Sequence, residues 1–203
     1  MQILNHDQRS TEWYEARLGK PSASQFGRII TPTGKPSSQV EGYINELIHE
    51  RITGERQETV SSEWMQRGVE MEPDAILWYE IVKGIKVNQV GFCLHDTMAV
   101  GGSPDGLICD DGGLEIKCPA PQNHIGYVRD SRIPTKYIPQ VQGCMWITER
   151  KWWDFLSYHP DYPKMLVRVH RDETFISKLE QEVAKMITLV DNGVKSLKEN
   201  SDE

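Results

Sequence analysis

The sequence lacks the features of a metal-cluster, secreted or membrane protein. Its four cysteines (Cys93, Cys109, Cys118 and Cys144) include no Cys-x-x-Cys pair, which argues against a zinc or iron–sulfur site and favours reduced thiols in a cytosol-like compartment. No N-terminal signal pattern is present, and no apolar run is long enough to span a bilayer. We therefore expect a cytoplasmic protein with no membrane partner.

The chain also lacks an excess of positive charge. It has 23 Lys and Arg residues against 30 Asp and Glu residues, a formal net charge of −7. Proteins that hold nucleic acid mainly through its phosphates are usually basic, so composition alone does not suggest a DNA partner. If DNA is the substrate, either the basic residues gather on one surface or the topology of the enzyme keeps it on DNA.

Hydrophobic patterning predicts an α/β fold, a central mixed β-sheet flanked by helices. The 203 residues show neither an internal repeat nor a linker, which predicts a single domain over residues 1–203. Helices are predicted over residues 12–18, 22–30, 38–53, 62–83 (broken or kinked near Pro73), 122–130 and 173–198, and one opens at residue 137. Strands are predicted over residues 85–94, 97–101, 107–109, 114–118, 151–158 and 165–169.

Residues 102–119 carry the clearest chemical signal. Two short apolar runs flank Asp110-Asp-Gly-Gly113, a turn-forming segment, so the stretch is typical of a β-hairpin. Alternation along the second strand puts Glu115 and Lys117 on one face, and the hairpin folds Asp105 back towards Glu115. Two carboxylates beside an ammonium group suggest a divalent cation with oxygen ligands. The alternative is a surface hairpin with a solvated Glu/Lys pair.

The spacing of these residues is similar to that of a known nuclease signature. Asp105 follows Pro104, and nine residues separate it from Glu115-Ile-Lys117, as in the PD-(D/E)xK nucleases. The wording Ser-Pro-Asp-Gly and Leu-Glu-Ile-Lys-Cys-Pro, followed by Gln140-Val-Gln142 and Met145-Trp146, resembles the lambda-exonuclease and YqaJ-type viral recombinase family. The resemblance implies a restriction-endonuclease-like fold.

The resemblance also implies a metal-dependent active site. Asp105, Glu115 and the carbonyl of Ile116 are expected to hold Mg²⁺, with Mn²⁺ as a possible substitute. Glu72 is expected to complete the position of a second ion. Glu70 and Asp74 are its rivals on the same helix.

Two further side chains are expected to act on the attacking water. Lys117 would orient or deprotonate it, and Gln140 would help to place Lys117 or the water. Gln142 competes with Gln140 for this assignment. Cys144 stands where the family has an aromatic residue.

A pocket for a 5′-terminal phosphate is the next implication of the resemblance. The segment Arg17-Leu-Gly-Lys-Pro-Ser-Ala-Ser24 matches the family's pocket motif, and Ser103 matches another phosphate-contacting position. Ser22 to Gln25 also has the pattern of a helix capping box, whose free N–H groups attract anions. Without the resemblance, an ordinary cap and a surface arginine explain this segment equally well. Where relatives offer a further arginine, this chain has Asn123-His124.

Two weaker DNA contacts complete the expected site. Lys35 lies in a Pro/Gly/Ser loop where the family carries a basic loop, although a plain linker fits as well. Met65, with Trp64, lies where the family places an apolar wedge that splits the duplex. Glu63 replaces a basic residue of the family there, and core packing is the alternative for both apolar side chains.

The function implied by the resemblance is an alkaline-type 5′-to-3′ exonuclease of double-stranded DNA ends. It would release 5′-mononucleotides and leave a 3′-ended single strand for phage-type recombination with a single-strand annealing protein. The family forms ring-shaped homotrimers. A ring around the DNA would also explain how a protein with a net negative charge stays on its substrate. A restriction-like endonuclease and a non-cleaving DNA-binding relative are the alternatives.

Overall fold

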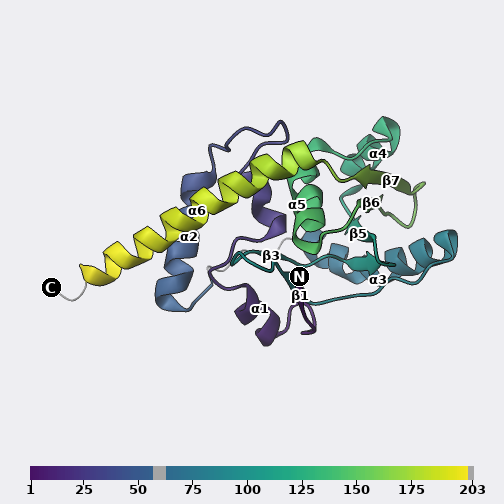
Figure 1. Ribbon diagram of the computed structural model, residues 1–203. Coiled ribbons are helices and arrows are strands. Elements are labelled where there is room, and N and C mark those ends of the chain that lie inside the picture. Colours follow the sequence, from purple (N-terminus) through teal and green to yellow (C-terminus); the bar gives the residue numbers. More distant parts are fainter. Residues whose placement is uncertain (57–62, 201–203) are drawn as a thin grey trace.

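The structure is a computed structural model that describes residues 1–56 and 63–200; the side chains of residues 63–65 lie outside that description. The helices are α1 (Thr11–Arg17), α2 (Val40–Thr53), α3 (Glu63–Lys83), α4 (Pro121–Asp130), α5 (Ile138–Thr148) and α6 (Glu173–Glu199), with 3-10 helices η1 (Ala23–Arg28) and η2 (Thr135–Tyr137) (Figure 1). The strands are β1 (Gln2–Leu4), β2 (Phe92–Leu94), β3 (Gly101–Gly102), β4 (Gly106–Ile108), β5 (Gly112–Lys117), β6 (Trp152–Ser157) and β7 (Met165–His170).

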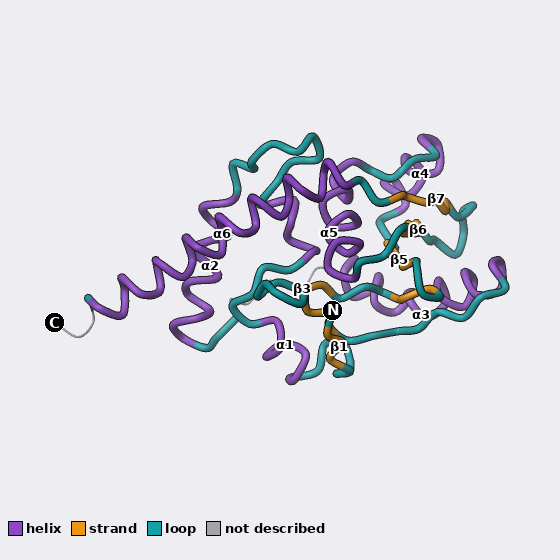
Figure 2. Tube along the Cα trace, in the orientation of Figure 1, coloured by secondary structure: helices purple, strands orange, loops and turns teal. Residues whose placement is uncertain are grey.

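The strands form two sheets among helices, which confirms the predicted mixed α/β fold (Figure 2). The four-stranded sheet has the order β4-β5-β6-β7. Its central pair β5–β6 is parallel and both outer pairs are antiparallel. The chain crosses from β5 to β6 through α4 and α5, as a parallel connection requires. Strands β1, β2 and β3 form a separate antiparallel sheet.

The two faces of the four-stranded sheet pack against different helices. Leu114 and Ile116 of β5 belong to a core cluster with Tyr79 of α3. Trp153 and Phe155 of β6 belong to the other cluster, with residues of α5 and α6. Because β5 and β6 are paired in register, Glu115 and Lys117 share the second face with Phe155. The predicted alternation of β5 is therefore confirmed.

A buried carboxylate fixes α3 on the first face. The Tyr79 hydroxyl donates to Asp154 Oδ2 (2.8 Å), and Arg168 donates to both Asp154 oxygens (2.8 and 2.9 Å). Asp154 is only 1% exposed, so the guanidinium and the phenol replace its lost hydration. The guanidinium of Arg168 also lies 3.5 Å from the centre of the Trp152 ring. This network sets the position of the helix that carries Glu72.

The β4–β5 hairpin forms as predicted, but its glycines serve another purpose. The turn occupies residues 109–111, with Cys109 at φ 44°, while Gly112 and Gly113 lie within β5. A Cβ on either glycine would lie 2.1–2.3 Å from a ring atom of Trp152 or Trp153, the paired residues on β6. The glycines are therefore required by the tryptophan rings and not by the turn.

Arg150 is distant from this hairpin in the sequence, but its guanidinium group bonds the hairpin backbone. Its Nη1 donates to the carbonyl oxygens of Ile108 (3.1 Å), Cys109 (2.7 Å) and Gly112 (2.7 Å). The side chain is buried, and its bonds to Ile108 and Gly112 give partners to the carbonyls of two buried residues. One guanidinium therefore fixes the loop that joins the Asp105 strand to the Glu115 strand.

Several predicted boundaries were wrong. The segment after Ser22 is the 3-10 helix η1, and neither Ser22 nor the N-cap of α2, Gln39, makes a side-chain capping bond. The strands predicted over 85–94 and 97–101 shrink to β2 and β3. Helix α3 continues through Pro73, so the predicted break is absent, and the alternative of a kink there stays a prediction. Each error arose where a local pattern competed with tertiary contacts.

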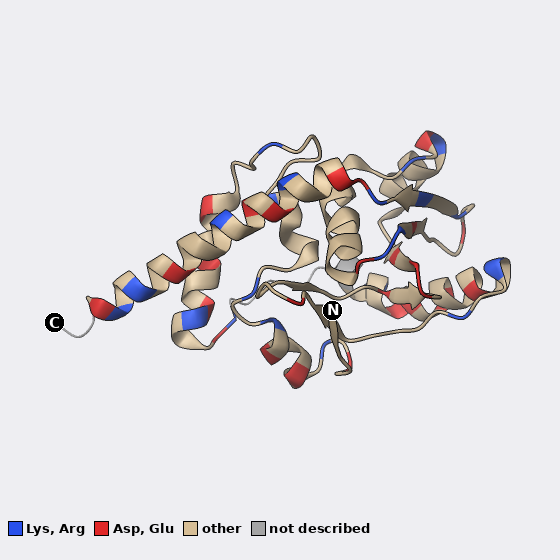
Figure 3. Ribbon diagram, in the orientation of Figure 1, with Lys and Arg blue, Asp and Glu red and all other residues tan. Residues whose placement is uncertain are grey.

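Helix α6 is the long helix predicted over residues 173–198; it is amphipathic, and it crosses and packs against α2 and α5 (Figure 1). Its buried stripe runs from Phe175 to Val190, whereas Leu197 near the end of the helix is 49% exposed. In Figure 3, Lys and Arg are interspersed with Asp and Glu along this helix. Within the described parts of the chain, no helix combines the length and apolar character needed to cross a membrane.

Candidate active site

The hairpin brings Asp105, Glu115 and Lys117 together. Lys117 Nζ lies 2.5 Å from Glu115 Oε1, and Glu115 is almost fully buried. The Ile116 amide donates to Asp105 Oδ2 (2.5 Å), which turns Asp105 over the edge of β5 beyond the start of β4. The expected convergence of two carboxylates and one ammonium group is thus present.

The carbonyl of Ile116 faces the same edge. In a paired strand the N–H and C=O of one residue point to the same side, and the Ile116 N–H points to Asp105. The carbonyl of Lys117 points the other way, because it accepts a bond from the Tyr158 amide (2.9 Å). Ile116 therefore offers a carbonyl oxygen beside the Asp105 carboxylate.

The electrostatics of this group are those of crowded like charges. Burial raises the pKa of Asp105 well above its usual value, and the Glu115 carboxylate raises it further, against the opposing effect of Lys117. Burial by itself lowers the pKa of Lys117, but Glu115 and Asp105 outweigh it and raise that pKa. Lys117 is therefore an ammonium group here, and it neutralises only part of the carboxylate charge.

The oxygen atoms fit a divalent cation. Glu115 Oε2 is buried and has no hydrogen-bond partner within the described residues, an unsatisfied acceptor that a cation would satisfy. Carboxylate and carbonyl oxygens are the ligands that Mg²⁺ prefers. In the described parts of the chain, however, no group of three or more His, Cys, Asp or Glu residues is placed to hold a metal. A site at this position relies on Asp105, Glu115 and the Ile116 carbonyl.

Glu72 lies at the same cleft but has another partner. It contributes to the raised pKa of Asp105, and it lines a cleft of about 1080 Å³ together with Asp105, Lys117 and its rival Glu70. Arg9 donates to Glu72 Oε2 (3.2 Å). Glu70 is exposed, and Asp74, the other rival, is not a lining residue of this cleft. The role of Glu72 at a second ion stays a prediction, and it requires release from Arg9.

The structure separates the two glutamines of α5. Gln140 Nε2 donates to Glu115 Oε1 (2.6 Å), so Gln140 is at the site and contacts Glu115 instead of Lys117. Gln142 bonds the backbone of His170 and Asp172 and is buried away from the carboxylates. Cys144, one turn beyond Gln140, is also buried, and burial raises its thiol pKa.

The predicted phosphate-pocket residues also gather. Arg17 donates to Ser103 Oγ (2.9 Å) and to Ser22 Oγ (3.4 Å), and the hydroxyls of Ser22 and Ser24 lie 3.4 Å apart. Burial, with Arg56 nearby, lowers the pKa of Arg17 to about 10, so the guanidinium stays charged at neutral pH. The hydrogen-bond partners of Arg17 in the described structure are hydroxyls, which leaves its charge available to an anion.

Trp13 is a residue of this pocket that the sequence did not single out. Its Nε1 donates to Ser103 Oγ (2.9 Å), and its ring lies 4.1 Å from the Arg17 guanidinium. Ser103 Oγ thus accepts two bonds and keeps its own proton for a ligand oxygen. The sequence signal that could have identified Trp13 is its position four residues before Arg17, which places both side chains on one face of α1.

Other cations of the cleft were also missed. Arg56 lines both the cleft and the cavity beside Arg17, and its guanidinium lies 5.1 Å from the centre of the Tyr14 ring. Lys136 lines the cleft together with Tyr137. Asn123 lines it too, where relatives have an arginine.

The two weaker DNA contacts stay untested. Lys35 is exposed in the loop after η1, where its amide bonds the Thr31 hydroxyl, and it does not line the cleft. Met65 lies in α3, but its side chain is outside the described residues. Neither position contradicts a role on DNA.

Known proteins resemble this chain over most of its length. The family model described as YqaJ-like viral recombinase domain matches residues 12–151. The alkaline exonuclease LHK-Exo from Laribacter hongkongensis has a similar structure, with a TM-score of 0.88, 36% sequence identity and coverage of 95% of this chain and 98% of that chain. LHK-Exo in complex with dAMP gives a TM-score of 0.87 at 36% identity, with the same coverage.

A phage-related exonuclease from Haemophilus somnus 129PT shares the fold, with a TM-score of 0.71, 16% identity and coverage of 88% of this chain and 96% of that chain. No curated protein matches the sequence. The matched segment includes the whole hairpin and the first turns of α5. The chain therefore belongs to the YqaJ-like viral recombinase family, with a fold of the PD-(D/E)xK nuclease type.

Proposed function

We propose that the protein is an Mg²⁺-dependent 5′-to-3′ exonuclease of double-stranded DNA ends. It digests the 5′-ended strand to 5′-mononucleotides and leaves 3′ single-stranded DNA for recombination by strand annealing. The observation that carries the proposal is the convergence of Asp105, Glu115 and Lys117 at one cleft. Family membership and the likeness to an alkaline exonuclease support a nuclease role.

The carboxylates would form the metal site. Asp105, Glu115 and the Ile116 carbonyl would hold one Mg²⁺, or Mn²⁺ in its place, and Glu72 would join a second ion. Bound there, the cation would polarise the scissile phosphate and lower the pKa of the attacking water. The unpaired Glu115 Oε2 is the oxygen that supports this assignment.

Lys117 would orient the attacking water. Without a bound cation the carboxylates raise the pKa of Lys117, so it is an ammonium group that donates to the water. Deprotonation of the water by Lys117 would require that a bound cation first lower this pKa. Gln140 would act through Glu115, since its amide holds Oε1 of that carboxylate. It leaves Oε2 free to face a cation.

The Arg17 pocket would give the enzyme its direction. Arg17, Ser24 and Ser103 would bind the 5′-terminal phosphate with one guanidinium and two hydroxyls. Ser103 is two residues from Asp105, so a phosphate held there keeps the end of the strand beside the cutting site. Each cut creates a new 5′-phosphate that can occupy the same pocket.

A ring-shaped homotrimer would keep the enzyme on DNA despite its net charge of −7. Basic and acidic residues both line the described cleft, so it is not strongly basic. The basic residues are Arg9, Arg56, Lys117 and Lys136, and the acidic ones are Glu70, Glu72 and Asp105. Encirclement would supply the retention that bulk charge does not. We expect sedimentation equilibrium to give three times the 23.3 kDa chain mass, and a monomer at all concentrations would contradict the ring.

The decisive test of the proposed function compares linear duplex with covalently closed circular duplex. With Mg²⁺, we expect linear DNA to be digested to 5′-mononucleotides and the circle to stay intact, because an exonuclease requires an end. EDTA should stop digestion, because the carboxylates then lack their cation. Mn²⁺ should restore it.

Each alternative has its own outcome. Cleavage of the closed circle would indicate an endonuclease of the same fold. Binding of both DNAs without cleavage in Mg²⁺ or Mn²⁺ would indicate a non-cleaving relative. A single-strand annealing protein is the expected partner, which would take up the 3′ strand.

A further inference from the structure

Lys136 and two tyrosines form a cluster that the proposed chemistry does not use. Lys136 lies in η2, directly before α5, and its Nζ is 4.9 Å from the centre of the Tyr137 ring and 5.9 Å from that of the Tyr127 ring. The two rings meet edge to face, with centroids 6.4 Å apart, and Tyr137 also packs on Phe155 of β6 at 5.1 Å. The lysine is thus seated on a rigid aromatic support.

The charge of Lys136 is not neutralised by the protein. Within the described residues, no carboxylate lies within 4 Å of its Nζ, although ion pairs occupy Lys86, Lys117, Lys151 and Lys185. Partial burial lowers its pKa, but the phenols of Tyr127 and Tyr137 outweigh that effect and raise it. Lys136 is therefore a cation that lines the cleft without a carboxylate partner among the described residues.

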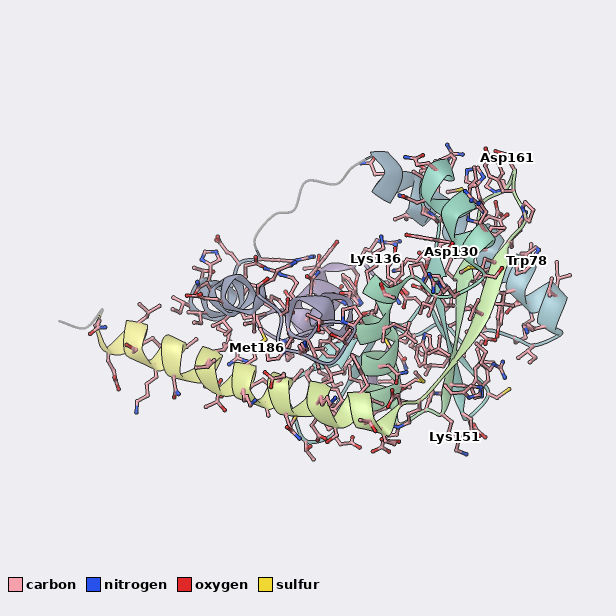
Figure 4. All side chains as sticks on the ribbon, turned by 90° about the horizontal axis from the view of Figure 1, so that it is seen from above. Trp78, Asp130, Lys136, Lys151, Asp161 and Met186 are labelled. Atoms are coloured by element: carbon pink, nitrogen blue, oxygen red, sulfur yellow. The ribbon has the colours of Figure 1, made fainter. Side chains whose placement is uncertain are left out.

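Its position connects two hollows. Lys136 and Tyr137 line the active-site cleft, and they also line a second cavity of about 390 Å³ that includes Ser24, Arg28 and Gln140. Figure 4 shows Lys136 at one end of the four-stranded sheet and Lys151 at the opposite end. The cation thus stands on the wall between the cutting site and the neighbouring cavity.

The Tyr137 ring contacts both Lys117 and Lys136, so it gives an upper limit on the distance between their ammonium groups. Lys117 Nζ lies 5.3 Å from the centre of this ring and Lys136 Nζ 4.9 Å, so the two ammonium groups are within about 10 Å of each other. One DNA strand carries a phosphate every ~3.4 Å of helix axis. A strand whose scissile phosphate is at Lys117 therefore has the neighbouring phosphate within reach of Lys136.

We propose that Lys136, held by Tyr127 and Tyr137, binds a second phosphate of the strand being cut, next to the scissile one. The proposal rests on the proposed function for the identity of the strand, but the ligand chemistry is a phosphodiester in either case. Lys136 is thus a DNA-binding residue of the cleft, distinct from the Arg17 pocket. In this proposal its ammonium group forms an ion pair with a DNA phosphate. A protein with a net charge of −7 can form few such pairs.

The test separates binding from cleavage. Lys136→Ala and Lys136→Arg are compared with wild type by salt titration of binding to linear duplex in EDTA, and by steady-state cleavage in Mg²⁺. We expect Lys136→Ala to lower the slope of log K against log salt by about 0.9, with affinity at 0.1 M salt down by roughly tenfold. KM should rise, kcat at saturating DNA should hold, and Lys136→Arg should retain the wild-type slope.

Lys151→Ala is the matched control, since it removes an exposed lysine that pairs with Asp111 at the other end of the sheet. Its slope should equal that of wild type. An unchanged slope in Lys136→Ala, or a loss of kcat without a loss of affinity, would overturn the proposal. If wild type binds DNA but cleaves none, the proposed function fails, and the EDTA titration still decides whether Lys136 binds a phosphate.

Discussion

Replacing Lys117 with methionine is expected to lower the rate of cleavage by about 10²–10⁴-fold, the range for losing a positioned catalytic group. Binding of linear duplex in EDTA should change little, because Lys117 is paired with Glu115 and its charge is not available to a phosphate. Methionine keeps most of the side-chain volume at a site beside buried Glu115. Single-turnover cleavage and equilibrium binding measure the two effects separately.

The same variant should bind the divalent cation more tightly. Lys117 partly neutralises Glu115 and Asp105, so without it the carboxylates repel one another and gain more from a cation. We expect Mg²⁺ to raise the melting temperature of Lys117→Met by more than that of wild type. Full cleavage by the variant, or a Mg²⁺-dependent shift no larger than that of wild type, would contradict the role assigned to Lys117.

Replacing Arg17 with alanine should remove the preference for phosphorylated ends. A hydrogen bond to a charged group contributes about 1.5–3 kcal/mol, which corresponds to roughly ten- to a hundredfold in kcat/KM on 5′-phosphate ends. The first nucleotide should be released from ends with a 5′-hydroxyl at the wild-type rate, so the first cut on that substrate provides the control. Rates on the two ends, measured on otherwise identical duplexes, give the ratio directly.

Arg17→Lys sharpens this test. Lysine keeps the charge but loses the planar fork that bonds Ser103 and Ser22 together, so an intermediate preference is expected. If wild type digests both ends equally fast, the pocket does not bind the terminal phosphate. An equal loss on both ends in Arg17→Ala would instead indicate a structural role through the Trp13 ring, which Arg17 covers.

The sequence predicted the cutting site better than its surroundings. Alternation along β5 and the turn after β4 are local rules, and they placed Asp105, Glu115 and Lys117 correctly. The choice between Gln140 and Gln142 could not be made locally, because both lie on one short helix and only its packing decides which meets Glu115.

Residues that act through distant contacts were the ones missed. Trp13 meets Ser103 across 90 positions of sequence, and Lys136 is defined by rings on two different elements. No periodicity or motif reports such a contact. The capping pattern at Ser22 failed for the opposite reason, since a strong local pattern was overridden by the packing of η1.

The Arg150 clamp has a consequence for the synthesis of the protein. Asp105, Glu115 and Lys117 leave the ribosome well before the arginine that bonds the carbonyls of Ile108, Cys109 and Gly112. Strand β5 also lacks its parallel neighbour until β6 follows. A nascent chain that ends before Arg150 therefore carries all three cutting residues without the bonds that align them. We therefore expect the three residues to reach their final alignment late in translation, when most of the chain already exists.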